Sequence, residues 1–206
     1  MNNPTEPAWP TYEIGPNDSI FAIGVASINF ARLEYALSLL FSTVTDIPLD
    51  LTNGLFPKIG NDTRTALIMR ALAQKKKWPV EATDGVTHFV NGFSKCAENR
   101  NHLMHSDARE NIYVANETVL TKANKRGERL ILFAEKALLR NVADAMRAYS
   151  DYGLDLQRSI FAWVYNSVIA QHDWPAGQPP WPRRPPSPQL LPYTSPPSQP
   201  NATPPP

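Results

Sequence analysis

Apolar residues recur at steps of three and four positions in two long parts of the chain, which is the spacing of one helical face. In the first part, Asn17, Asp18 and Ser19 offer capping oxygens ahead of the repeat. That repeat runs through Phe30, Leu33, Leu37, Leu40 and Val44. The second repeat runs through Leu139, Val142, Met146, Tyr149, Gly153, Leu156, Ile160 and Val164. These patterns predict two long amphipathic helices, over about residues 18–45 and 135–171.

Two shorter helices are predicted between the long ones. A loop containing Pro48, Gly54 and Pro57 follows the first long helix, and Asn61 or Asp62 can then cap a helix that ends near Lys77, before Trp78-Pro79. The next helix covers about Val80 to His105. Its apolar face consists of Val86, Phe89, Val90, Phe93 and Ala97.

Residues 107–134 have a different pattern, made of short runs rich in β-branched and aliphatic residues: NIYVA, TVLTKA and RLILFA. Lys125-Arg126-Gly127 supplies a turn between the last two runs. The chain is therefore expected to be mainly α, with an up-and-down four-helix core and a small antiparallel β-hairpin or three-stranded insert before the last long helix. The apolar face of that helix is long for one chain to cover, so we expect a homodimer.

Prolines mark both ends of this helical domain, which we place at residues 17–172. Prolines at positions 4, 7, 10 and 16 predict a flexible arm over residues 1–16. Of the 21 prolines, 14 lie between positions 175 and 206. Proline lacks the amide hydrogen that helices and sheets require, so residues 173–206 are expected to form a disordered tail. Its PPWPRRPP segment has the spacing that polyproline-binding grooves accept, although a simple soluble tail has the same composition.

Composition limits the class of protein. With 206 residues, of which 42% are hydrophobic, the chain can bury one good core. A net charge of +1 supplies no strong field toward nucleic acid or an anionic membrane, so nucleic-acid binding would have to be local. A single cysteine, Cys96, and the lack of a recognisable secretory signal favour a cytoplasmic protein. Asn29, Arg32 and Glu34 interrupt the longest apolar stretch, so no membrane span is expected.

The stretch CAENRNHLMHS, residues 96–106, concentrates polar chemistry at the end of a predicted helix. Asn101 and His105 stand four positions apart and therefore share a helical face, and the long side chain of Arg100 can lie beside them. Histidine can transfer a proton near neutral pH, and a guanidinium can neutralise phosphate oxygens. This set suits cleavage of an RNA phosphodiester by its own 2′-hydroxyl, without a metal or other cofactor.

Arg100-Asn101-xxx-His105 resembles the R-N-x-x-x-H form of the R-x4-6-H motif of the HEPN superfamily. The stretch NFARLEYALSLL is similar to the first helix of a bacterial subgroup, and the likeness covers roughly residues 17–170. The resemblance implies a four-to-five-helix bundle whose dimer forms one composite cleft, and a metal-independent endoribonuclease of a toxin–antitoxin or phage-defence system. It implies Arg100 on the scissile phosphate, His105 as acid or base, and Asn101 as a further site residue. Other members of the superfamily are non-catalytic modules, so the alternative is a dimeric interaction module that binds an antitoxin or another protein.

Further residues complete the prediction. Glu34 lies at the margin of an apolar face and needs a partner, for which Arg100 is the candidate; the pair would either orient the site or only join two helices. The cations of the insert, which are Lys122, Lys125, Arg126 and Arg129, could contact RNA phosphates or simply form a solvated turn. His102 and His105 lack a nearby set of carboxylates or thiolates, so no metal site is expected.

Overall fold

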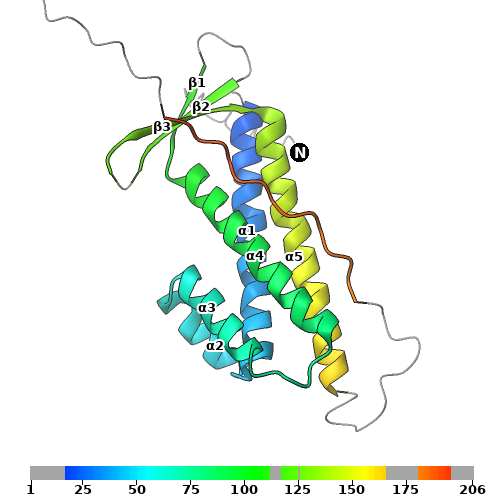
Figure 1. Ribbon diagram of the computed structural model, residues 1–206. Coiled ribbons are helices and arrows are strands. Elements are labelled where there is room, and N and C mark those ends of the chain that lie inside the picture. The colour runs from blue at the N-terminus through cyan, green and yellow to red at the C-terminus, as the bar shows by residue number, and fades with distance from the viewer. Residues whose placement is uncertain (1–16, 112–116, 125, 166–180, 196–206) are drawn as a thin grey trace, which may run out of the picture.

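The computed structural model describes residues 17–111, 117–124, 126–165 and 181–195 (Figure 1). The prediction of a mainly helical chain with a small antiparallel β element is confirmed. The helices are α1 (Asn17–Thr45), α2 (Leu49–Leu55), α3 (Asn61–Leu72), α4 (Val80–Met104) and α5 (Lys136–Val164), and a 3-10 turn, η1, covers Phe56–Lys58. The strands are β1 (Asp107–Glu110), β2 (Glu117–Ala123) and β3 (Arg129–Glu135). The predicted N-terminal arm lies outside the described residues.

The three long helices form the body of the molecule, with α1 and α5 parallel and α4 antiparallel to them (Figure 1). Lys136 pairs with Asp18 near the start of α1, and Gln157 bonds to Thr43 near its end, so α1 and α5 run in the same direction. By length and composition α1 could span a membrane, with 39% of the relevant window buried in this molecule. Its buried face, which is apolar at three- and four-residue steps, packs on α4 and α5.

Helix α2 lies where the sequence predicted only a loop. Its seven residues contain Gly54, but Thr52 is fully buried and Phe56, just after the helix, packs edge-on against Phe41 at 5.4 Å between ring centroids. Because α2 reverses the chain, α3 runs parallel to α1, as the contacts of Arg64 with Glu34 and of Lys75 with Asp46 indicate. Of the four helices that were predicted, the first two, α1 and α3, run in the same direction, so the predicted up-and-down order of four helices is wrong.

Two glycines allow α4 and α5 to approach closely. A Cβ on Gly92 of α4 would lie 1.8 Å from Cε1 of Tyr149, and a Cβ on Gly153 of α5 would lie 2.3 Å from Cε2 of Phe89. Tyr149 and Phe89 are fully buried at this contact. The aromatic rings occupy the space that side chains at the two glycine positions would need, which fixes the position of α4 along α5.

The sheet stands at the end of α4 (Figure 1). Its order is β1-β2-β3, all antiparallel, and the register of β2 on β3 places Lys122 opposite Leu130. Gly127 adopts a φ of 79° in the turn between these strands, a conformation that glycine adopts without strain. Since only two residues separate the end of α4 from the start of β1, the sheet is held close to the polar end of that helix.

Residues 181–195, which we call the strap, form an extended segment across α4 and α5 (orange to red in Figure 1). The Asn99 side chain donates to the Gln189 carbonyl (2.7 Å) and accepts from the Leu191 amide (2.9 Å). Leu191 is buried, and Thr194 forms a β-bridge with Ile131 of β3. This packing corrects the prediction of a tail disordered throughout residues 173–206; residues 173–180 and 196–206 lie outside the described part of the chain.

Candidate functional site

A cavity of about 630 Å³ opens between the start of α3, the C-terminal half of α4 and strand β2. It forms because α4 ends in polar residues at steps of three and four, so their side chains leave the core on one face. Two predicted site residues, Asn101 and His105, line this cavity together. The other lining residues are Asn61, Asp62, Phe93, Ser94, Ala97, Glu98, His102, Lys122 and Ala123.

The three motif residues lie at or beside the cavity. His105 is the C-cap of α4, with φ −111° and an exposed side chain, and its amide donates to the Asn101 carbonyl (3.1 Å). Nη1 of Arg100 donates to Oδ1 of Asn101 (3.2 Å), and the guanidinium carbon lies 5.8 Å from the centroid of the Phe30 ring. An amide at the cavity wall is thus held by a guanidinium whose other N–H groups have no hydrogen-bond acceptor among the described residues and could bind an anion.

Glu34 pairs with Arg64, so the prediction that Arg100 is its partner is wrong. Nη1 of Arg64 lies 3.0 Å from Oε1 of Glu34 and donates to Oδ1 of Asn61 (2.7 Å). Nε and Nη2 of the same guanidinium donate to the Phe56 carbonyl at 3.1 and 2.6 Å. The reversal of the chain through α2 places this arginine on the side of α1 that carries Glu34. The carboxylate therefore reaches the cavity wall through Arg64 and Asn61.

His102 is held by three neighbours from three elements. Nζ of Lys122, on β2, contacts Nδ1 of the imidazole and lies 3.3 Å from Nε2, and Oε1 of Glu98, one turn earlier on α4, lies 3.5 Å from Nε2. The Tyr193 ring of the strap lies at 4.7 Å, tilted by 33°. Burial lowers the pKa of His102, and the Lys122 charge lowers it further, against the opposing effect of Glu98. The pKa of Lys122 is also lowered, again chiefly by burial.

Tyr193 ties the strap to this group. Its hydroxyl lies 2.8 Å from Oγ of Ser106 and donates to the His102 carbonyl (3.3 Å), and its ring lies 4.9 Å from Nζ of Lys122. Burial raises the pKa of the tyrosine, so its hydroxyl stays protonated near neutral pH. The sequence reasoning did not include Tyr193, although a tyrosine and a Leu-Leu pair among the prolines are unlike the composition of a typical disordered segment.

The remaining predicted residues occupy several positions. Of the four cations considered for RNA contact, Lys122 lines the cavity, Arg126 and Arg129 are exposed at the β2–β3 turn, and Lys125 lies outside the described residues. Within the described ranges, no three His, Cys, Asp or Glu side chains are grouped to hold a metal. Burial raises the pKa of the Cys96 thiol to about 12, so this thiol does not supply a thiolate nucleophile.

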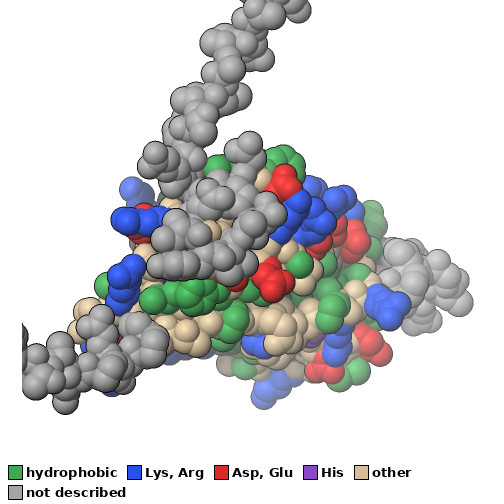
Figure 2. All heavy atoms as spheres, turned by 90° about the horizontal axis from the view of Figure 1, so that it is seen from above, with side chains coloured by type: hydrophobic (Ala, Val, Ile, Leu, Met, Phe, Trp, Pro, Cys, Tyr) green, Lys and Arg blue, Asp and Glu red, His purple; other side chains and the backbone are tan. Residues whose placement is uncertain are grey.

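The charge on the face seen in Figure 2 is mixed. Lys, Arg, Asp and Glu side chains are interspersed on it, in agreement with a net charge of +1. On this face an anion therefore meets no large positive patch. Attraction has to come from local groups such as Lys122 and Arg100.

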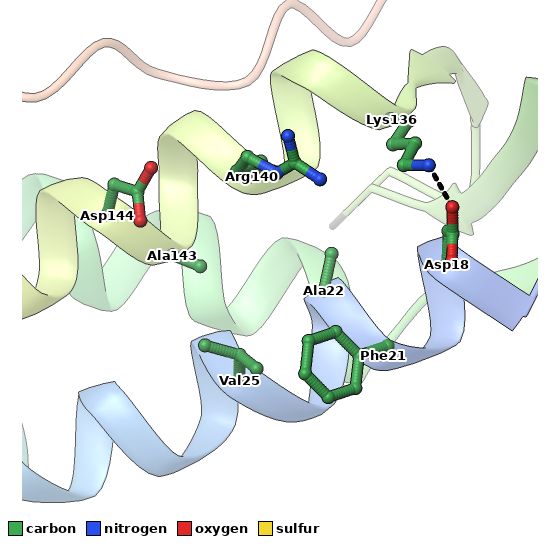
Figure 3. Close-up of a pocket in the computed structure, with 8 residues that line it drawn as sticks. All are labelled: Asp18, Phe21, Ala22, Val25, Lys136, Arg140, Ala143 and Asp144. Carbon is green, nitrogen blue, oxygen red and sulfur yellow. Dashed lines mark hydrogen bonds and ion pairs between the residues drawn. The ribbon is translucent and has the colours of Figure 1, made fainter.

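A smaller cavity of about 200 Å³ lies between α1 and α5 (Figure 3). The ion pair of Lys136 with Asp18 closes one end, and Phe21 stands at its edge beside the small side chains of Ala22 and Ala143. Among the residues that the structure describes, its lining contains no histidine and none of the predicted site residues. The polar end of α4 is therefore the better candidate for chemistry.

No family model, curated protein or solved structure matches this chain. The resemblance to the HEPN superfamily thus depends on Arg100-Asn101-xxx-His105 and on the order of the predicted elements, and it stays a prediction. The site has to be interpreted from its own geometry and chemistry.

Proposed function

We propose that this protein is a metal-independent endoribonuclease of the HEPN type that cleaves single-stranded or loop RNA. The observation that carries the proposal is the cavity at the end of α4, where Asn101 and the exposed His105 meet and where Arg100 bonds to Asn101. A histidine buried in packing could not reach a substrate, whereas His105 is open to solvent. The arrangement supports proton transfer beside a bound phosphodiester.

In the proposed reaction the 2′-hydroxyl of the substrate attacks its own phosphorus. The 2′-oxygen–phosphorus bond forms, the bond from phosphorus to the 5′-oxygen breaks, and the products carry a 2′,3′-cyclic phosphate and a 5′-hydroxyl. His105 transfers a proton to or from these oxygens, and Arg100 stabilises charge on the phosphorane. Asn101 holds a phosphate oxygen or hydroxyl, and the exposed Arg126 and Arg129 bind more distant phosphates.

A homodimer is part of this proposal. Helix α1 carries an exposed apolar stripe at seven-residue spacing, with Phe21 73%, Ile28 65% and Tyr35 56% exposed. Such a stripe is typical of the seam between two helices that pack side by side. Dimerisation through α1 would bring two cavities together in one dimer. An enzyme that cleaves RNA in this way would suit a toxin–antitoxin or phage-defence system.

The test compares wild type with His105→Ala on a pool of single-stranded and structured RNAs in EDTA, with the product ends identified. We expect cleavage that leaves a 2′,3′-cyclic phosphate and falls at least about 100-fold in the variant, which is the usual contribution of a proton-transfer residue. Asn91→Ala, at an exposed position of the same helix, is the matched control. Failure of the wild type to cut any RNA would overturn the proposal and favour the interaction module.

A further inference from the structure

We propose that His102 is the general base of the cavity and His105 its general acid, so that one chain carries both proton-transfer groups. This inference rests on the proposed ribonuclease function and assigns a role to a residue at a position that the R-N-x-x-x-H motif leaves unspecified. Both imidazoles line the same cavity from the last turn and the C-cap of α4. Their environments differ, and acid and base roles divide in this way when two titratable groups have different surroundings.

The surroundings of His102 keep it neutral and oriented. Nζ of Lys122 on β2 contacts Nδ1 and lies 3.3 Å from Nε2, Oε1 of Glu98 on α4 lies 3.5 Å from Nε2, and the Tyr193 ring of the strap covers one side. An ammonium can only donate, so Nδ1, the nitrogen that it contacts more closely, presents a lone pair. The Glu98 carboxylate can only accept, so it favours a proton on Nε2. His102 therefore carries the tautomer in which Nδ1 can accept a proton.

Binding of a substrate phosphate would draw Lys122 away from His102 and so make the lone pair on Nδ1 available. The Lys122 ammonium has no ion pair with a carboxylate among the described residues, and its pKa is already lowered by burial. A phosphate oxygen entering the cavity offers the cation a stronger partner than the neutral imidazole, because donor and acceptor then carry opposite charges. As Lys122 turns toward the phosphate, Nδ1 of His102 becomes free beside the bound nucleotide.

The proton balance is complete without a co-reactant. Nδ1 of His102 takes the proton of the 2′-hydroxyl as the 2′-oxygen bonds to phosphorus. Protonated His105, which is exposed at the cavity rim, gives its proton to the departing 5′-oxygen. The protein is left with His102 protonated and His105 neutral, and exchange with water restores both. Lys122 and Arg100 stabilise the negative charge that develops on the phosphorane oxygens.

The test uses the full chain and two substrates: a single-stranded RNA that the wild type cleaves, and a uridine 3′-(4-nitrophenyl) phosphate, whose leaving group needs no proton. We expect His105→Gln to lose at least about 100-fold on RNA but far less on the nitrophenyl ester. His102→Gln should lose at least about 100-fold on both, because the 2′-hydroxyl needs a base in either case. Asn91→Gln is the control, and urea unfolding checks that each variant is folded.

The pH dependence of the cleavage rate distinguishes a proton-transfer role of His102 and His105 from a merely structural one. His102→Gln should remove the acidic limb of the rate profile and His105→Gln the alkaline limb. Lys122→Met should shift the acidic limb to higher pH, since the cation beside the base is gone. A folded His102→Gln that cleaves RNA within about threefold of wild type would overturn this inference while the proposed function stands. A wild type without RNA cleavage would overturn both.

Discussion

Two of the cations near the cavity, Arg64 and Lys122, are held in opposite ways. The Arg64 side chain is 11% exposed and donates to three oxygen-bearing partners, a carboxylate, an amide and a backbone carbonyl. Lys122 contacts an imidazole nitrogen and the face of Tyr193, and within the described ranges it has no ion pair with a carboxylate. Arg64 is saturated with acceptors, whereas Lys122 has only the more distant charge of Glu98 and no direct ion pair among the described residues.

The difference separates a cation that holds the fold from one that is available to a ligand. A buried guanidinium with all its acceptors in place resists any change, because each broken bond leaves a polar group without a partner. An ammonium held by a neutral ring exchanges partners at little cost when an anion arrives. The four predictions below test this separation, beginning with the largest effect.

Replacing Arg64 by methionine should lower the free energy of unfolding by about 3 kcal/mol. The substitution keeps the aliphatic stem but removes all bonds to Phe56, Glu34 and Asn61. Urea unfolding measures the loss, and Arg70→Met, at an exposed position of the same helix, should change stability by less than about 0.5 kcal/mol. If Arg100→Met showed the large loss instead, the pairing of Glu34 predicted from the sequence would be right after all.

Asn99→Ala should cost about 2 kcal/mol, because it removes both hydrogen bonds that join α4 to the strap. The amides of Leu191 and Thr194 should then exchange hydrogen faster, as measured by hydrogen–deuterium exchange with mass spectrometry. Lys95→Ala, which removes only the exposed bond to Ser187, is the control. Unchanged exchange in Asn99→Ala would mean that Tyr193 and Leu191 hold the strap without this clamp.

Lys122→Met should change the free energy of unfolding by less than about 1 kcal/mol, in contrast to Arg64→Met, because the contacts of Lys122 are few. The pKa of His102 should rise toward its ordinary value, since one of the two effects that lower it is removed. An NMR titration of the imidazole carbon-bound protons measures this shift. Lys76→Met serves as the control, and an equal pKa in both variants would show that Lys122 does not act on His102.

The smallest expected effect is on the pH dependence of stability. The pKa of His102 is lowered in the folded protein, so between that pKa and about 6.5 the unfolded chain binds more protons. The stabilising contribution is present above this window and is lost as the pH falls through it. Urea unfolding of wild type and His102→Gln across this range should give the shallower slope for the variant. Equal slopes would show that the imidazole has the same pKa in both states.

The patterns that the sequence could predict are local. Periodic apolar residues placed both ends of α1 and α4, and the start of α5, within about one residue of their observed positions, whereas α5 ends at Val164 and not near residue 171. The four-residue spacing of Asn101 and His105 was enough to place both on one cavity wall. Each of these predictions depends only on residues within a few turns of one another. The geometry of a helix then determines which of them share a face.

Features formed by distant residues were not predictable in this way. Helix α2 has only seven residues and too few apolar repeats to signal its presence, and without it the partner of Glu34 could not be found. The strap is held by contacts such as Asn99 with Gln189, 90 positions apart, which composition does not reveal. The site of His102 needs β2 to bring Lys122 back beside α4, which depends on the tertiary packing of the sheet.

The position of the strap in the sequence also determines when it is synthesised. Ribosomes make it after every other described element, so α4, α5 and the sheet exist before the segment that crosses them. At about 5 to 20 residues per second, the stretch from the end of α5 to Tyr193 takes about 1.5 to 6 seconds to synthesise. During that interval the nascent chain contains His102 but not yet Tyr193, whose ring packs on the imidazole in the complete chain. The cavity is therefore without its tyrosine when the rest of the site has just been synthesised.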